Sequence, residues 1–76
     1  MNLYRFQVTI EKKNIQGQKS VDVIIVANDD ESAFRLAEIE VERHYLTLPM
    51  IKEMVLYERK KIGNKGGGYV LDETVD

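Results

Sequence analysis

The residues best suited to chemistry lie at 58–73, where a basic run breaks into glycines in the sequence ERKKIGNKGGGYVLDE. The backbone amides of a glycine-rich loop, together with a lysine, can bind phosphate. Walker and Rossmann phosphate loops both lead into a helix whose amino end faces the phosphates, and the Walker loop also needs Ser or Thr after its lysine. Here no hydroxyl residue adjoins Lys65, and the apolar run from Tyr69 to Leu71 follows the glycines. The pattern therefore predicts a glycine-rich turn leading into a short strand.

The cations of this stretch leave room for a weaker anion site. Tyr57 and Tyr69 interleave with them, as aromatic side chains do on surfaces that bind single-stranded nucleic acid. A net charge of -2, and a helix candidate at 28–42 with six carboxylates against one arginine, make a nucleic-acid partner unfavourable. Weak anion or nucleic-acid binding is therefore the alternative function, and its contact residues would be Arg59, Lys60, Lys61 and Lys65.

Other residue types offer no catalytic set. His44 follows Glu40 by four residues, a spacing that can place two metal ligands on one helix face, but the sequence supplies no third ligand. The hydroxyl residues stand in no nucleophile motif, and the chain has no cysteine. We therefore predict no catalytic, cofactor-binding or metal-binding residues, and a protein that is not an enzyme.

The elements that would position these residues follow from hydrophobic periodicity. Alternation from Tyr4 to Glu11 predicts a half-buried strand, and a polar turn containing Asn14 and Gly17 leads into a second strand at 20–27. The acidic run 28–31 predicts the amino end of a helix, which Pro49 would stop near 44–47. A third strand at 51–62 and a short fourth strand at 68–71 complete the order β-β-α-β-β.

This order predicts a single small α+β domain, residues 1–76, in which one helix packs on a three- to four-stranded sheet. The ordered core should span about 2–71, with an acidic, frayed tail at 72–76. A helix between the second and third strands makes these two strands run in the same direction. The basic turn containing Lys12, Lys13 and Lys19 would then lie at the opposite end of the sheet from the basic residues at 59–65.

Composition and the first residues indicate where the protein works. No apolar run approaches the roughly 20 residues of a membrane-spanning helix. Met1 is followed by alternating polar and apolar residues and not by a leader-like apolar segment, and cysteine is absent. We therefore expect a cytoplasmic protein with no membrane association.

Four segments resemble a known family over nearly the whole chain: LYRFQVTIEKK, VDVIIVANDDESAFRLAEIEVERHYL, LYERKKI and GGGYVL. They are similar to a family of short uncharacterised proteins from spore-forming Gram-positive bacteria. The resemblance implies a self-contained bacterial protein and implies no particular chemistry.

Apolar residues exceed what one helix can cover. On the sheet, the face away from the helix would carry Leu3, Ile24, Val26 and one of two sets in the third strand, either Met54 with Leu56 or Val55 with Tyr57. On the helix, Leu36, Ile39 and Leu46 fall off the stripe that contains Ala33, Phe34, Ala37, Val41, Tyr45 and Leu48. Large exposed apolar patches mark association sites, although scattered surface Leu and Ile are also common. We predict a protein–protein interaction or regulatory module that forms a homodimer or binds another protein.

Overall fold

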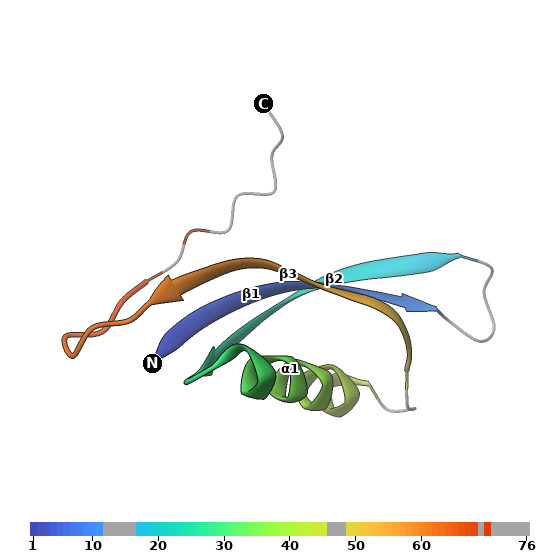
Figure 1. Cartoon of the computed structure of the whole chain (residues 1–76). Helices are drawn as coiled ribbons and strands as arrows, with labels where there is room; N and C mark the ends of the chain where they lie inside the picture. Colours follow the sequence, from blue (N-terminus) through green and yellow to red (C-terminus); the bar gives the residue numbers. More distant parts are fainter. Residues whose placement is uncertain (12–16, 46–48, 69, 71–76) are drawn as a thin grey trace.

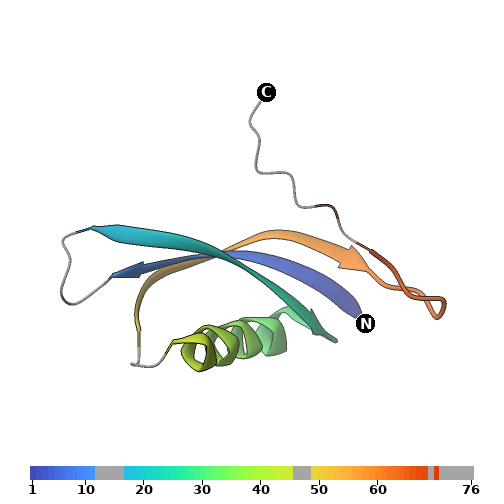
Figure 2. The same ribbon diagram turned by 180° about the vertical axis from the view of Figure 1, so that it is seen from behind.

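The structure, a computed structural model, describes residues 1–11, 17–45, 49–68 and 70. It contains the strands β1 (Asn2–Glu11) and β2 (Gln18–Ala27), the helix α1 (Asp30–His44) and the strand β3 (Met50–Lys61) (Figure 1). The strands form one curved sheet, and α1 lies against one face of it in both views (Figures 1 and 2). The other face of the sheet carries no helix among the described residues.

β1 is the central strand, in the order β2-β1-β3. Both of its neighbours run antiparallel to it. β2 and β3 therefore run in the same direction, as predicted, but β1 separates them. The long segment through α1 carries the chain from one edge of the sheet to the other.

The predicted fourth strand is wrong. The described residues Gly68 and Val70 belong to no strand, and Tyr69 and Leu71 lie outside the described residues, as does the predicted tail at 72–76. The chain instead closes a tight turn in which Gly63 and Gly66 form an isolated bridge and the Gly66 amide donates to the Gly63 carbonyl at 3.1 Å. Consecutive glycines lack side chains to pack on a sheet and lose much backbone entropy in a strand, so this segment has little to gain from pairing with β3.

The two ladders differ in regularity. β1 pairs with β2 without a break, from Asn2 opposite Ala27 to Glu11 opposite Gln18. Its pairing with β3 shifts register twice, between Arg5 and Phe6 and between Thr9 and Ile10. Such bulges place extra residues in one strand, which bends it and increases its twist. β3 is accordingly the most strongly curved strand in Figure 1.

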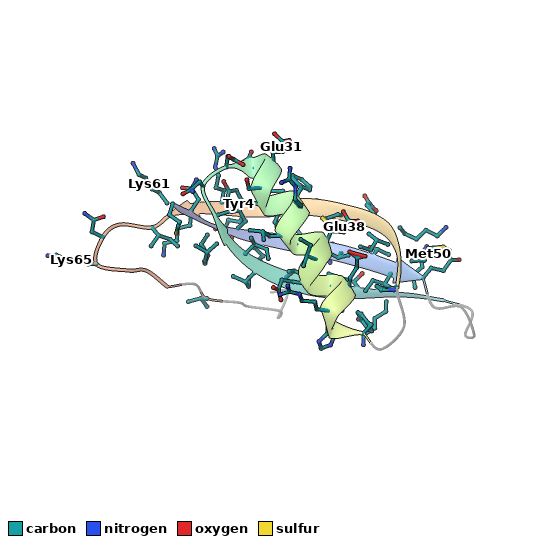
Figure 3. All side chains as sticks on the ribbon, turned by 90° about the horizontal axis from the view of Figure 1, so that it is seen from below. Tyr4, Glu31, Glu38, Met50, Lys61 and Lys65 are labelled. Atoms are coloured by element: carbon teal, nitrogen blue, oxygen red, sulfur yellow. The ribbon has the colours of Figure 1, made fainter. Side chains whose placement is uncertain are left out.

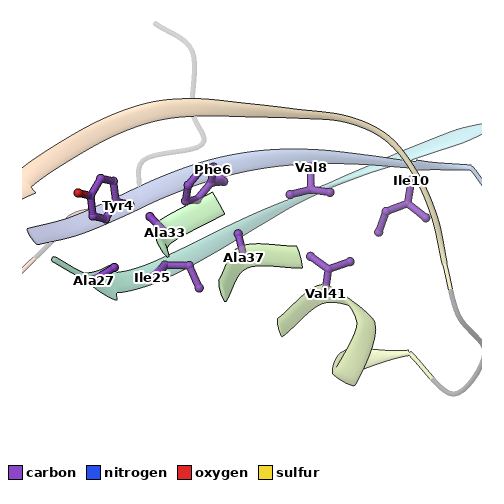
Figure 4. Packing of buried hydrophobic residues seen from close by; sticks show 9 residues of the cluster. All are labelled: Tyr4, Phe6, Val8, Ile10, Ile25, Ala27, Ala33, Ala37 and Val41. Atoms are coloured by element: carbon purple, nitrogen blue, oxygen red, sulfur yellow. The ribbon is translucent and has the colours of Figure 1, made fainter. Parts of the chain in front are cut away.

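The core lies between α1 and the sheet (Figure 4). β1 supplies its largest members, since the alternate residues of this strand all point toward α1, and the helix meets them with small residues that allow close approach. Phe34, at the margin, places its ring edge-on to that of Phe6 at 4.8 Å between centroids. The buried set is Tyr4, Phe6, Val8, Ile10, Ile25, Ala27, Ala33, Ala37 and Val41. The predicted core stripe of the helix is thus confirmed at its three buried positions.

α1 begins and ends where the sequence predicts. Asp29 is the N-cap, and its Oδ1 accepts a hydrogen bond from the Ser32 amide at 2.7 Å. The helix ends at His44, and Tyr45 is already extended. At the turn before β2, Gly17 adopts a φ of +134°, as its residue type predicts, while Asn14 lies outside the described residues.

The Asp29 cap predicts acid sensitivity. The hydrogen bonds from the backbone and side chain of Ser32, with the charge of Arg35, lower the pKa of Asp29 below its ordinary value of 3.8. Because the folded state binds this proton more weakly than the unfolded state, the cap's charge stabilises the fold above about pH 3.8. That contribution is lost as pH falls through the lowered folded pKa. Thermal unfolding between pH 7 and pH 2 will show it.

Asp29→Asn is the matched control, because asparagine caps a helix equally well and does not titrate. We expect the melting temperature of wild type to fall relative to that of Asp29→Asn as the solution is acidified. Asp29→Ala should melt below both proteins at neutral pH. Parallel pH profiles for wild type and Asp29→Asn would contradict a role for the carboxylate charge.

Candidate functional site

The sheet face opposite α1, called here the open face, carries three of the six residues predicted for association. Leu3 of β1 lies opposite Val26 of β2, and Ile24 lies opposite Arg5 one row away. Ile24 and Val26 are 37% and 47% exposed. Leu3, Ile24 and Val26 thus form one contiguous apolar corner, on the face where the sequence predicts them.

β3 adds a second apolar group to the open face. Of the two candidate sets in this strand, Met54 and Leu56 pack against the core. Val55 and Tyr57 are exposed, so these are the surplus residues that the sequence left between two alternatives. The open face therefore carries apolar side chains on both edge strands.

Arg5 lies between these two groups at the centre of the open face. Its Nη2 donates to Oδ2 of Asp22 at 2.9 Å, and the two side chains are only 18% and 21% exposed. On the other side, its guanidinium stands 5.4 Å from the centroid of the Tyr57 ring, within range of a cation–π interaction. Nε of Arg5 is buried and has no hydrogen-bond partner among the described residues. Arg5 thus connects all three strands of the open face.

No sequence pattern singles out Arg5. An outward-facing arginine on an alternating strand is ordinary; the register of the hairpin brings Asp22 to one side of it, and the strand order brings Tyr57 to the other. The sequence does place a carboxylate, that of Asp22, on the outward face of the second strand. It identifies the partner of Arg5 only when the register of the hairpin is known.

The second predicted apolar set is divided by the structure. Leu36 is exposed and lines a shallow hollow beside β2, together with Ile24, Val26 and Glu40. Ile39 is half-buried, and Leu46 lies outside the described residues. A larger hollow continues along β2 toward His44 and Tyr45. Leu36 therefore belongs to the margin between α1 and β2 and not to a separate surface.

The basic residues predicted to contact an anion do not share one face. Arg59 lies opposite Tyr4 and reaches Oδ1 of Asp30 at 3.1 Å, whereas Lys60 lies opposite Leu3 and donates to the Gly68 carbonyl at 2.7 Å. Lys61 and Lys65 are exposed at the same end of the sheet (Figure 3).

Lys19 lies at the opposite end, beside Ile10, as the predicted strand directions require. Lys12 and Lys13 are outside the described residues.

The helix residues considered for metal binding stay apart from any third ligand in the part of the chain that the structure describes. No group of three or more His, Asp or Glu side chains that could hold an ion occurs there. The His44 ring instead packs edge-on against Tyr45, with centroids 5.0 Å apart. No helix among the described residues is long and apolar enough to cross a membrane.

Comparison with known proteins gives one result. The model of a family described as a protein of unknown function (DUF3906) matches residues 1–71. No curated protein and no solved structure matches the chain. The resemblance to a family of uncharacterised proteins is thereby confirmed, while the origin in spore-forming Gram-positive bacteria stays a prediction.

Breaking the ion pair of the open face should destabilise the fold. Asp22→Ala leaves the Arg5 guanidinium largely buried without its carboxylate, which should cost about 1.5–3 kcal/mol of unfolding free energy. Replacing both partners, as Arg5→Leu with Asp22→Val, should recover most of that loss because no buried charge is left unpaired. Urea denaturation of the single and double variants measures the difference.

Glu40→Ala provides the control. It removes the exposed ion pair between Glu40 and Arg43, whose closest N–O distance is 3.8 Å, and should change stability by less than about 1 kcal/mol. Equal losses for Asp22→Ala and Glu40→Ala would contradict the central role of Arg5.

Proposed function

The chain belongs to the DUF3906 family of proteins of unknown function, and we propose that it is a small protein–protein interaction or regulatory module that self-associates. The proposal includes a bacterial, cytoplasmic, non-enzymatic protein that forms a homodimer. The observation that carries it is the contiguous apolar corner of Leu3, Ile24 and Val26 on a sheet face that no described element covers.

The composition of the open face supports association over a role as an inert surface. Exposed apolar patches on a small protein usually mark interaction sites. Aromatic residues and arginine carry much of the binding free energy at interfaces, and Tyr57 and Arg5 already contact each other here. Since Asp22 holds Arg5 in place, a partner would meet an arginine whose conformation is largely fixed.

Ile24→Asp tests the proposal. It places a carboxylate in the apolar corner at a position that is exposed in the isolated chain, so the fold should survive while association weakens. We expect the dimer dissociation constant to rise by at least about tenfold, as for loss of an interface hot spot. Sedimentation equilibrium over a concentration series measures the constant.

Met50→Asp is the matched control. Met50 is 51% exposed and lies on β3 opposite Glu11, at the far end of the sheet from the apolar corner. This variant should associate like wild type. A wild-type protein that stays monomeric at high concentration and captures no partner would refute the proposal.

As a second, separate function, we propose that the segment 59–65 binds an anionic ligand or nucleic acid. This proposal is supported by the exposure of Lys65, within the turn closed by Gly63 and Gly66, and of Lys61, at the end of β3 beside that turn. The engagement of Arg59 by Asp30 and of Lys60 by Gly68 reduces the charge free to meet a ligand.

A single-stranded oligonucleotide and inorganic phosphate are the probes for this second proposal. Binding through the segment should weaken steeply with salt, by about 0.7 log units per tenfold salt for each phosphate contacted on a single strand. It should be lost in a variant with Lys60→Ala and Lys61→Ala but kept in Lys19→Ala, at the other end of the sheet. Binding that is absent, or that does not change with salt, would reject it.

A further inference from the structure

The two edges of the sheet differ in how they are protected against pairing with another strand. Natural edge strands carry charges, prolines or bulges that prevent uncontrolled association. β3 has two bulges relative to β1, and its twelve residues include three lysines, two glutamates and an arginine. The ladder from β1 to β2 is regular over its whole length, and residues 23–27 of β2, sequence VIIVA, contain no charge and no proline. The unprotected edge is therefore that of β2.

The outer edge of β2 is also accessible. β2 pairs with β1 on one side only, so every second backbone amide and carbonyl of the strand points outward. α1 lies below this edge and leaves shallow hollows between itself and the strand, lined by Leu36, Glu40 and His44. Ile24 and Val26 are exposed at the same place. The edge therefore offers backbone hydrogen-bonding groups flanked by apolar side chains.

We propose that β2 pairs antiparallel with β2 of a second copy of this chain, which joins two sheets into one of six strands. This inference rests on the proposed self-association and specifies its geometry. Residues directly opposite each other in an antiparallel pair share a face, so a twofold axis at Ile25 places Ile24 of one copy opposite Val26 of the other. The apolar corners of the two open faces then become continuous.

In the same register, the paired residues 23–27 of the two copies carry no charged side chain. Val23 lies opposite Ala27 of the other copy on the face that bears the helices, and Asp22 lies opposite Asn28, outside this uncharged segment. Asp22 is in any case held by Arg5 of its own chain. Glu40, which lines the hollows beside this edge, is paired with Arg43 of its own helix at 3.8 Å, so the pairing leaves no charge without a partner at the contact.

The charge distribution along α1 favours a second copy as the occupant over an unrelated strand. The first turn of the helix carries Asp30 and Glu31, and the last turn carries Arg43 and His44. The twofold axis makes the two helices antiparallel, so the acidic end of each faces the basic end of the other across the new strand pair. Leu36, beside the middle of the uncharged segment, meets its own counterpart near the axis. An unrelated strand would bring neither the oppositely charged helix ends nor the second Leu36 side chain.

Cysteine cross-linking tests the pairing in a chain that has no native cysteine. A disulfide requires Cα atoms about 4.4–6.8 Å apart, a separation that opposed residues of paired strands satisfy. An equimolar mixture of Ile24→Cys and Val26→Cys proteins should give a cross-linked dimer under mild oxidation. Either protein alone should cross-link less, because its own two cysteines would be diagonal neighbours about 7–8 Å apart.

The control is a mixture of Val55→Cys and Tyr57→Cys proteins. These residues are likewise exposed on the open face and two positions apart, but they lie on β3. We expect no cross-link above background from this mixture. Equal cross-linking of the two mixtures would indicate stacking of open faces and would overturn the inference.

Hydrogen exchange on the wild-type chain gives a readout that needs no variant. Alternate amides of residues 23–27 should exchange at least about tenfold more slowly at a protein concentration that gives dimer than at one that gives monomer, while β3 amides stay unchanged. A dimer by sedimentation that shows neither this protection nor the disulfide would refute the strand pairing and leave the proposed function intact. A protein that is monomeric throughout would refute the strand pairing, and one that also captures no partner would refute the proposed function as well.

Discussion

The fold depends on the packing of α1 against the apolar row of β1. Tyr4, Phe6 and Val8 are fully buried beneath the helix, and no other described element is available to cover them. Ala33 and Ala37 let the helix approach closely, and its position then decides which set of side chains on every strand is core. The face left over is fixed by the same choice, since alternate residues of a strand point to opposite sides. The open face is thus a necessary by-product of a sheet with a single helix.

This dependence explains which parts of the architecture the sequence predicts. The two faces of β1 and β2 follow from alternation along each strand, and the ends of α1 follow from Asp29 and from Pro49, all of which are local signals. Strand order is non-local. The sequence shows that the second and third strands run in the same direction, but not that β1 lies between them.

The predicted fourth strand failed for a related reason. Tyr69 to Leu71 have the composition of a strand, but the residues that lead into a strand must also pack on the sheet. The glycines at 66–68 have no side chains to do so, and the Gly68 carbonyl already accepts a hydrogen bond from the Lys60 side chain. The candidate site was predictable to the same extent: its apolar members could be named, whereas the cluster of Arg5, Asp22 and Tyr57 required the order of the strands.

The central position of β1 also governs how the chain can fold as it is synthesised. β1 pairs with β2, the next strand along the chain, but its other neighbour comes from the far end of the described fold, where Lys61 stands opposite Asn2. On a ribosome, the nascent hairpin therefore emerges with a free edge on each strand, and β1 stays half-paired until β3 has been translated. Long-range pairing of this kind is slow, and unpaired edges expose a chain to misassembly. β1 therefore keeps one unpaired edge until β3 is available to pair with it.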